Sequence, residues 1–282
     1  MYQSTGKPTL YPMGALSITY GLHPNGLTDT LEMYRFKYVL GGIAVSVSKT
    51  RTGIVWGLPA RARSQRVRRV CEYLEKYYRP ARLGNPSDPT DVLVYIILSN
   101  KTAPKIAMST YKNLKASLPE WDHACNGHHR AIAELLHSSG LASKRSTYIV
   151  NALRRIRADF GSCDLNHAGE MDDSDLEVYL SSLPGVSAKV AKCVMLFGFE
   201  RSVLPVDTHV FRIAKRLGWV DRNRADQCHV ELESLVPSWR RYSFHVNCIS
   251  HGRTTCRPAH PFCQTCCIRS YCCYLEEAIA PS

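Results

Sequence analysis

The sequence predicts an all-α protein with a small β extension near its N-terminal end. Apolar residues recur three and four positions apart, as on one face of a helix, in a series of runs between residues 64 and 251. Turns rich in proline and glycine separate these runs, which number roughly ten. The 282 residues, 45% hydrophobic and 21% charged, are enough for one large folded domain or two small ones.

The N-terminal 62 residues match no pattern that we can name. Between Arg35 and Trp56, short apolar and β-branched runs alternate with glycine-containing breaks, which is typical of a β-hairpin. Helices are then expected over 64–78, 89–99, 104–118, 128–138, 144–160, 175–183, 187–197, 222–235 and 239–251, with a further helix starting after residue 207. The many basic residues of these helices are interpreted mainly as solvated faces.

The balance of charge favours a nucleic acid partner. The formal net charge is +12, which suits a polyanion and favours DNA over an acidic membrane. The longest apolar runs, such as residues 92–98, are far too short to cross a bilayer, and residues 1–22 lack the apolar core of a signal peptide. We therefore expect an intracellular protein without a membrane partner, acting as a monomer.

The stretch around Pro184-Gly185 is the best candidate for DNA contact. It forms a turn between two helical runs, and glycine allows backbone conformations and close approaches that other residues do not. The first N–H groups of the second helix have no intrahelical partner, so together with the helix dipole they attract phosphate. An ordinary helical hairpin is the alternative interpretation.

Two residue types of this region suit chemistry on a sugar. Lys189 lies in the first turn of the second helix, and an amine becomes nucleophilic when burial or a neighbouring cation, here Lys192, lowers its pKa. Asp207 is placed as the N-cap of the following helix, where its carboxylate can also stabilise positive charge. A solvated lysine and a simple cap are the alternatives.

The twelve cysteines cluster near the C-terminal end. Seven lie between Cys248 and Cys273, which points to a metal site in a reducing compartment rather than to a disulfide framework. Four of them have the spacing C-x6-C-x2-C-x5-C, which favours an iron–sulfur centre over the paired C-x2-C knuckles of zinc sites. These four are Cys256, Cys263, Cys266 and Cys272, and a shifted set that uses Cys267 and Cys273 is the alternative.

Together these motifs resemble the endonuclease III family of the helix-hairpin-helix DNA glycosylase superfamily. The family's hairpin reads approximately L-P-G-V-G-x-K-T-A, followed by V-D-T-H-x-x-R. The chain matches with Leu183-Pro184-Gly185-Val186, Lys189, Val206-Asp207-Thr208-His209 and Arg212, while Ser187 replaces the second glycine and Val190 replaces the threonine. The cysteine spacing equals that of the family, and the resemblance covers roughly residues 88–272.

The resemblance implies a two-lobed, all-α fold. It implies a six-helix barrel lobe over residues 89–217, with the helix-hairpin-helix at about 175–198, and an iron–sulfur lobe made of residues 63–88 and 218–282. Residues 1–62 form an N-terminal extension of unknown role. It also implies one [4Fe-4S] cluster on Cys256, Cys263, Cys266 and Cys272, whose role is to fix a loop near the phosphates.

By the same resemblance, the activity is that of a bifunctional DNA glycosylase and AP lyase on duplex DNA with a damaged base or abasic site. Lys189 is expected to attack the sugar C1′ of a flipped nucleotide, with Asp207 assisting. Relatives that lack the lysine use the aspartate with water.

The sugar in question is the 2′-deoxyribose of DNA, and the expected target base is an oxidised pyrimidine. Displacement of the base leaves a Schiff base on Lys189, and β-elimination then nicks the strand. The chain is also expected to lack the additional C-terminal domain that adenine glycosylases of this superfamily carry.

The resemblance places further residues at the DNA surface. Ser99-Asn100-Lys101-Thr102 stands where the family usually shows S-A-Q-A-T or S-Q-N-T, so Asn100 or Lys101 takes the place of the residue that fills the hole left by the flipped base. Leu141, in Gly140-Leu141-Ala142-Ser143-Lys144, is a candidate wedge between base pairs, with core packing as the alternative. The full set of expected DNA contacts is Pro184, Gly185, Val186, Ser187, Asn100, Lys101, Leu141, Lys192 and His209.

Three other functions stay open on the sequence alone. Lys101 at the position that probes the DNA favours a related lysine glycosylase acting on another modified or mismatched base. A catalytically silent DNA-binding protein would not need Lys189 and Asp207 together. A zinc-dependent DNA-binding module would hold zinc in place of iron and sulfide.

Overall fold

The computed structural model describes residues 34–40, 43–49, 55–79, 83–125, 129–137 and 142–274. The chain divides into two compact units, Met1–Arg51 and Thr52–Ser282. In the first unit, β1 (Tyr34–Leu40) pairs antiparallel with β2 (Ile43–Lys49), from Tyr34 opposite Lys49 to Leu40 opposite Ile43. This is the hairpin that the apolar runs predict.

Val55 and Trp56, the described part of the third apolar run, do not continue the hairpin. Val55 is fully buried in the second unit, where its N–H donates to the carbonyl oxygen of Gly218 at 3.1 Å. The indole N–H of Trp56 donates to the carbonyl oxygen of Trp219 at 2.9 Å. The N-terminal extension therefore ends earlier than the expected residue 62.

The regular elements in the described part of the second unit are helices, as the sequence predicts. The α-helices are α1 (Ala60–Tyr78), α2 (Pro89–Ser99), α3 (Pro104–Ser117), α4 (Trp121–Cys125), α5 (His129–His137), α6 (Ala142–Phe160), α7 (Asp173–Ser182), α8 (Ala188–Phe197), α9 (Thr208–Arg216), α10 (His229–Leu235) and α11 (Arg241–Thr254). Short 3-10 turns lie between several of them.

Local chemistry explains where several helices begin. The side chain of Asp88 accepts a hydrogen bond from the N–H of Asp91 at 2.9 Å, and Pro89 occupies the first helical position of α2. Pro104 occupies the same position in α3. Proline has no N–H to lose there, and its fixed φ suits the first turn. A capping aspartate and a proline thus mark the start of α2, and a proline marks the start of α3.

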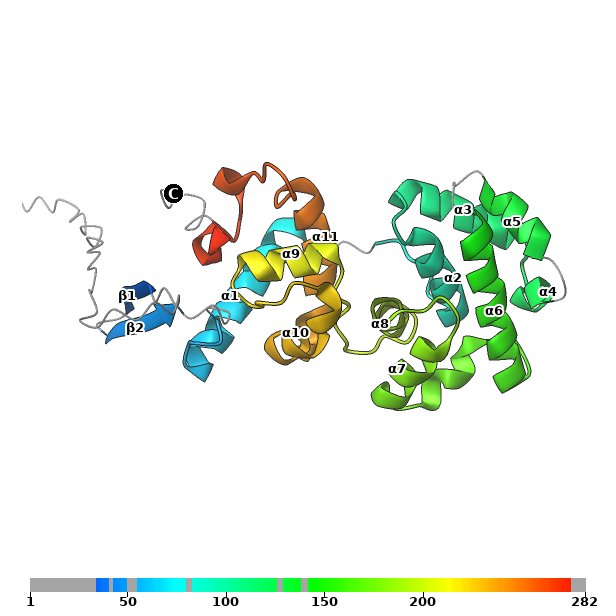
Figure 1. Ribbon diagram of the computed structural model, residues 1–282, viewed down its shortest axis with the longest axis horizontal. Coiled ribbons are helices and arrows are strands. Elements are labelled where there is room, and N and C mark those ends of the chain that lie inside the picture. The colour runs from blue at the N-terminus through cyan, green and yellow to red at the C-terminus, as the bar shows by residue number, and fades with distance from the viewer. Residues whose placement is uncertain are drawn as a thin grey trace, which may run out of the picture. The chain divides into compact units, whose positions relative to one another are not determined.

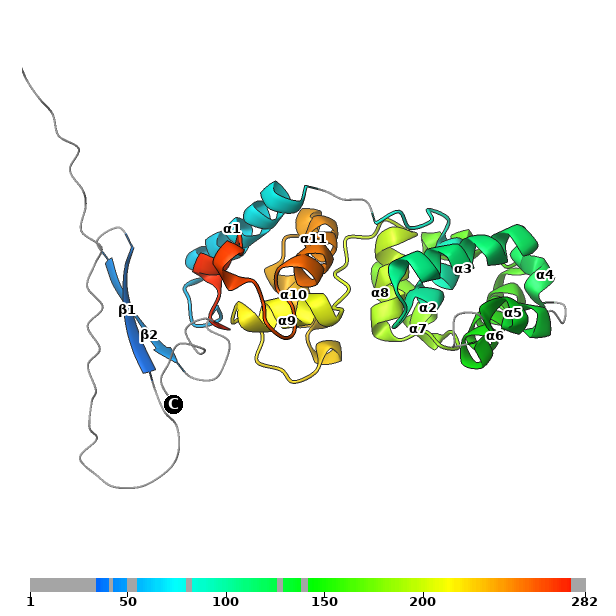
Figure 2. The same cartoon turned by 90° about the horizontal axis from the view of Figure 1, so that it is seen from above.

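Buried side chains form two separate hydrophobic clusters within the second unit. The first runs from Val92 to Val203, and the second combines Val55 to Leu74 with Leu204 to Ile268. Figures 1 and 2 show the corresponding groups: α2 to α8 lie together, and α1, α9, α10 and α11 lie together.

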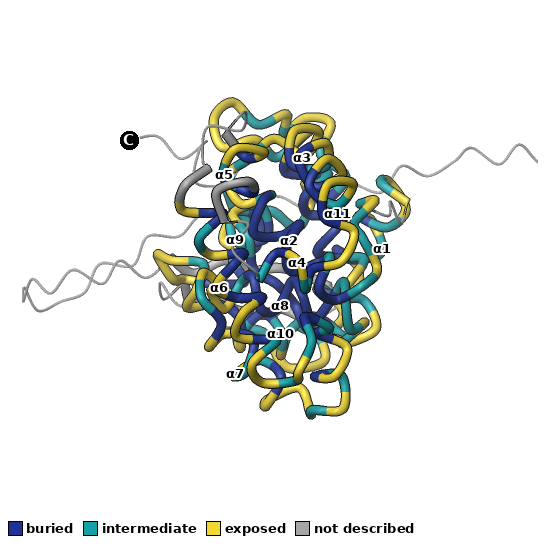
Figure 3. The backbone as a smooth tube through the Cα atoms, turned by 90° about the vertical axis from the view of Figure 1, so that its right-hand side faces the viewer, coloured by how far each residue is buried: buried dark blue, intermediate teal, exposed yellow. Residues whose placement is uncertain are grey.

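The division between the clusters differs from the expected lobe boundary at residue 217. Val210 and Ile213 of α9 are buried in the second cluster, so α9 packs with α11 and not with the barrel helices. Helix α2 lies within the first cluster, where every residue from Val92 to Leu98 is buried. Figure 3 shows this buried interior in dark blue.

Candidate catalytic and DNA-binding site

The turn between α7 and α8 is shaped by a glycine that no other residue can replace without strain. Gly185 has φ +81°, and a Cβ atom there would lie 2.4 Å from Cγ of Tyr148. Buried Leu183 and Val186 flank the turn and anchor it in the first cluster. The Ser187 hydroxyl accepts from the N–H of Val190 at 3.4 Å and caps α8. The first N–H groups of α8 are therefore presented from a turn held in one conformation.

Lys189 lies in the first turn of α8, half-buried, as the sequence predicts. Its amine interacts electrostatically with the thiol of Cys193, one helical turn further on. The pKa of Lys189 is raised by Cys193 and by the carboxylate of Asp207, which together outweigh the lowering effect of burial. This differs from the expected lowered pKa, because the neighbours of the amine are not cations.

Cys193 is buried beside the amine, and sequence reasoning missed it. Burial raises the pKa of its thiol. The lysine lowers this pKa and Asp207 raises it, which shows that the three groups share one small region. The spacing of four residues on a helix was the available signal, because positions i and i+4 lie on the same face.

Asp207 is the N-cap of α9, as predicted. One of its carboxylate oxygens accepts from the N–H of His209 at 2.9 Å and from the N–H of Val210 at 2.8 Å. These bonds fix the carboxylate while Pro205 and Val206 on its N-terminal side are buried. The cap and the electrostatic contact with Lys189 are two uses of the same side chain.

His245 of α11 is a second residue that sequence reasoning missed. It is buried, and its Nδ1 lies 2.9 Å from the carbonyl oxygen of Pro205. A carbonyl only accepts, so Nδ1 carries the hydrogen of a neutral ring. Burial lowers the pKa of this imidazole, which also interacts electrostatically with Asp207 and Lys189. No signal in the sequence joins a residue of α11 to this site.

Lys192 does not stand beside Lys189 as a second cation. Its ammonium is 5% exposed and donates to Glu177 of α7 at 2.8 Å and to Glu233 of α10 at 3.0 Å. Burial lowers its pKa, but the two carboxylates outweigh that effect and raise it. Because α7 belongs to the first hydrophobic cluster and α10 to the second, Lys192 connects the two. Its ammonium is occupied by these carboxylates, so we leave it out of the proposed DNA surface.

His209 contacts Arg212, three residues further along α9. The guanidinium lies 3.2 Å from Nδ1 of His209 and donates to the carbonyl oxygens of Gly252 and Cys256, each at 3.0 Å. Burial lowers the pKa of His209. Arg212 thereby joins the helix that Asp207 caps to α11 and to the cysteine loop.

The Asn100–Lys101 turn follows α2 and is exposed. Asn100 ends the helix in an extended conformation, and Lys101 has φ +55°. Leu141, the expected wedge, lies outside the described residues. Of the expected contacts in the hairpin turn, Gly185 and Ser187 are exposed, Pro184 is half-buried and the side chain of Val186 is buried.

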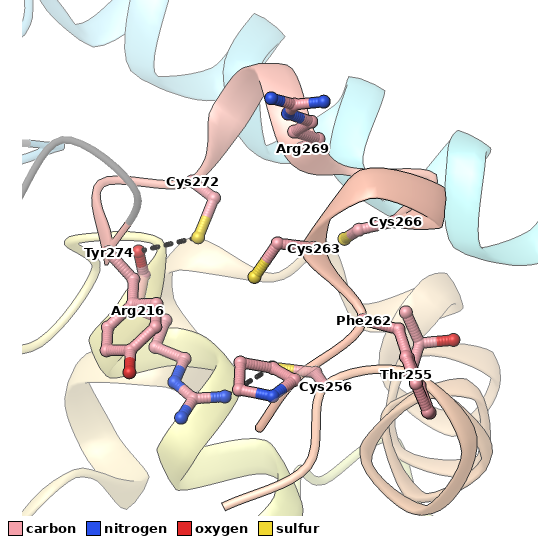
Figure 4. A pocket seen from close by; sticks show the side chains of 10 residues that line it. Arg216, Thr255, Cys256, Phe262, Cys263, Cys266, Arg269, Cys272 and Tyr274 are labelled. Carbon is pink, nitrogen blue, oxygen red and sulfur yellow. Dashed lines mark hydrogen bonds between the residues drawn. The ribbon is translucent and has the colours of Figure 1, made fainter. Parts of the chain in front are cut away.

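Four cysteines line one pocket in the C-terminal loop. They are Cys256, Cys263, Cys266 and Cys272, and the pocket holds about 280 Å³ of empty space that is partly open to solvent. Figure 4 shows Arg216 beside them, where its guanidinium lies 3.1 Å from the sulfur of Cys256. Nε2 of His251 lies 3.6 Å from the sulfur of Cys266.

The alternative cysteines have other surroundings. Cys273 is buried, and its N–H donates to the carbonyl oxygen of Arg216 at 2.8 Å. Neither Cys267 nor Cys273 lines the pocket. Among the described residues, no three His, Cys, Asp or Glu side chains already stand as close as the ligands of a formed metal site. The thiols nevertheless fit an iron–sulfur cluster, since four sulfur donors face one cavity next to a cation that offsets thiolate charge.

Comparisons with known proteins identify the family. Residues 94–238 match the family of HhH-GPD superfamily base excision DNA repair proteins, and the chain belongs to this family. A protein of Arabidopsis thaliana named as a candidate DNA glycosylase is 34% identical over 169 residues, which make up 58% of this chain and 56% of the relative. Endonuclease III of Thermotoga maritima is 29% identical over 186 residues, covering 66% of this chain and 83% of that enzyme.

The fold is also that of a solved relative. A structure described as a trapped endonuclease III–DNA covalent intermediate in an estranged-adenine complex has a TM-score of 0.66 and 22% sequence identity, and the match covers 77% of this chain and 98% of that one. The two-lobed helical architecture expected from the hairpin motif is therefore confirmed at the level of fold. In the described part of the chain, no helix has the length and apolar character needed to cross a bilayer.

Proposed function

We propose that this protein is a DNA glycosylase of base excision repair that also cleaves the strand as an AP lyase. The observation that carries the proposal is that Lys189, in the first turn of α8 after the glycine turn, interacts electrostatically with Asp207, the N-cap of α9, and with Cys193, one helical turn further along α8. The structural neighbour described as a trapped covalent intermediate of endonuclease III with DNA supports a covalent step by analogy. A protein that only binds DNA has no need of an amine beside a carboxylate.

In the proposed reaction, the turn and the first N–H groups of α8 hold phosphate while the target nucleotide is extruded. The neutral amine of Lys189 forms a bond to C1′, and the bond from C1′ to the base breaks, so the base leaves with the electron pair and takes up a proton. Opening of the sugar gives a Schiff base. Loss of a proton from C2′ then breaks the bond between C3′ and the phosphate oxygen, which nicks the strand.

The raised pKa of Lys189 gives Asp207 its role. Free Lys189 is protonated at neutral pH, so it must lose a proton before it attacks. The carboxylate of Asp207, which interacts electrostatically with the amine, is the acceptor proposed for that proton, and it also stabilises positive charge that develops on the sugar. Its bonds to the N–H groups of α9 hold it in place during both steps.

The substrate is proposed to be an oxidised pyrimidine in duplex DNA, bound by a monomer inside the cell. The specific observation for the alternative, another modified or mismatched base, is the exposed Lys101 at φ +55° in the turn after α2. A cation there presents hydrogen-bond donors to DNA, where the related motifs present glutamine.

One [4Fe-4S] cluster is proposed on Cys256, Cys263, Cys266 and Cys272. When bound, the cluster supplies a rigid cross-link of the C-terminal loop. Arg216 and Arg212 tie that loop to α9, so a fixed loop also steadies the helix that Asp207 caps. The two lobes are proposed to follow the two hydrophobic clusters, with α9 in the cluster lobe.

The experiment compares three proteins on two duplexes, one with a thymine glycol and one with a plain abasic site. Wild type should release thymine glycol from the first duplex and should nick the damaged strand of each duplex. Lys189→Gln should lose nicking on both duplexes, and Asp207→Asn should keep DNA binding but lose most turnover. Nicking by Lys189→Gln, or turnover by Asp207→Asn at the wild-type rate, would contradict the assigned roles. Activity on the abasic duplex alone would keep the lyase and move the search to other bases.

A further inference from the structure

Arg145 is buried although it lies on a helix whose basic residues otherwise suggest a solvated face. It is 7% exposed, near the start of α6. Burial lowers the pKa of its guanidinium. A buried guanidinium is costly unless its donors find acceptors, so its partners matter.

Its partners are oxygen atoms at the end of α2 and in the turn that follows. Nη1 donates to the carbonyl oxygen of Leu98 at 2.7 Å and to the hydroxyl of Thr102 at 2.8 Å. Nη2 donates to the carbonyl oxygen of Asn100. The last carbonyls of a helix lack intrahelical partners and carry the negative end of its dipole, so they suit a cation.

These bonds hold the chain on both sides of Lys101. Asn100 and Thr102 are each tied to the same guanidinium, and the residue between them has φ +55°. A left-handed conformation is unfavourable for lysine, and it persists where the surroundings fix it. The side chain of Lys101 is exposed between two tethered neighbours.

We propose that Arg145 is a positioning residue that presets the Asn100–Lys101 turn, and that this turn discriminates among the bases opposite the extruded nucleotide. The proposal rests on the proposed function for its DNA step, because the turn must meet DNA. Its first step, the coupling of Arg145 to the turn, does not involve DNA and can be tested in the free protein.

The first arm of the test measures hydrogen exchange in the free protein. The variants are Arg145→Met and the milder Thr102→Val, which removes one acceptor and leaves the buried guanidinium in place. Arg155→Met is the matched control, since Arg155 lies on the same helix, is half exposed and pairs with Asp159 at 2.7 Å. Faster exchange at residues 100–103 in the two test variants only is the expected result. Unchanged exchange in Thr102→Val, or equal exchange in the control, would overturn the coupling.

The second arm measures binding to four duplexes that carry an uncleavable abasic analogue opposite each of the four bases. Wild type should separate the best from the worst opposite base by about fivefold or more, the effect of one hydrogen bond. Arg145→Met and Thr102→Val should reduce this ratio toward one with less effect on mean affinity, and Arg145→Lys should restore part of it. A wild type that does not discriminate, or a ratio unchanged in the variants, would overturn the proposal.

The two arms separate the possible failures. Loss of all binding to abasic duplexes by wild type would refute the proposed function, while the exchange arm would still report on the tie between Arg145 and the turn. A purely structural role predicts lower stability in Arg145→Met with the ratio among opposite bases intact.

Discussion

Gly185→Ala is expected to destabilise the protein through two separable effects. A non-glycine residue in the left-handed region costs about 1–2 kcal/mol, and Gly185 has φ +81°. The added Cβ would also lie 2.4 Å from Cγ and 2.6 Å from Cβ of Tyr148. Rotation of the half-exposed ring cannot relieve the second contact, and overpacking of this kind costs about 1–3 kcal/mol. The expected loss is therefore about 2–5 kcal/mol.

The assay is urea unfolding, with the free energy obtained by linear extrapolation. Gly161→Ala is the matched control, because Gly161 also has φ +81° but a Cβ there meets nothing within 4 Å. It should show only the conformational cost of about 1–2 kcal/mol. Equal losses in the two variants would refute the steric argument. A Gly185→Ala protein as stable as wild type would refute the whole account of the turn.

Three further predictions concern the neighbouring side chains. Cys193→Ala removes the largest influence that raises the pKa of Lys189, so the rise of nicking rate with pH should shift to lower pH, and a profile that stays in place would contradict this. Lys192→Met leaves two carboxylates without their cation and should cost about 2–4 kcal/mol in urea unfolding, toward the lower end because Glu177 is one-third exposed; no loss would show that the ion pairs contribute nothing. Iron and sulfide content should fall in serine variants of the four pocket cysteines and persist in Cys267→Ser and Cys273→Ser, and the reverse pattern would favour the shifted set.

Local signals allowed much of the helical framework to be predicted. Asp207 caps α9, as its short polar side chain before an apolar run predicted. The helix expected over residues 187–197 is α8, which begins directly after its cap, Ser187. The start of α2 at Pro89 followed in the same way. These features depend on residues within one helical turn, so the sequence alone contains them.

The partners of the buried charges could not be predicted in the same way. Lys192 meets Glu233, 41 residues away, and Arg145 meets Leu98, 47 residues away. Lys192 was expected to stand beside Lys189 and to contact DNA, and Arg145 was expected to lie on a solvated face. Helical periodicity does not say which polar residue a distant element will cover. The approach of Tyr148 to Gly185 is another contact of this kind.

The choice among the cysteines was predicted in part from local sequence. Spacing favoured Cys256, Cys263, Cys266 and Cys272, and the pocket is lined by this set. Spacing could not predict that the Cys273 backbone pairs with Arg216 and that its side chain is buried.

The central claim is that Lys189 forms a covalent bond to the sugar of damaged DNA. The most direct test is borohydride trapping on a duplex with one thymine glycol, followed by mass mapping of the peptide that carries the adduct. The account predicts a trapped complex in wild type, an adduct on the peptide that contains Lys189, and no complex in Lys189→Gln. A complex that persists in Lys189→Gln, or an adduct on another residue, would contradict it.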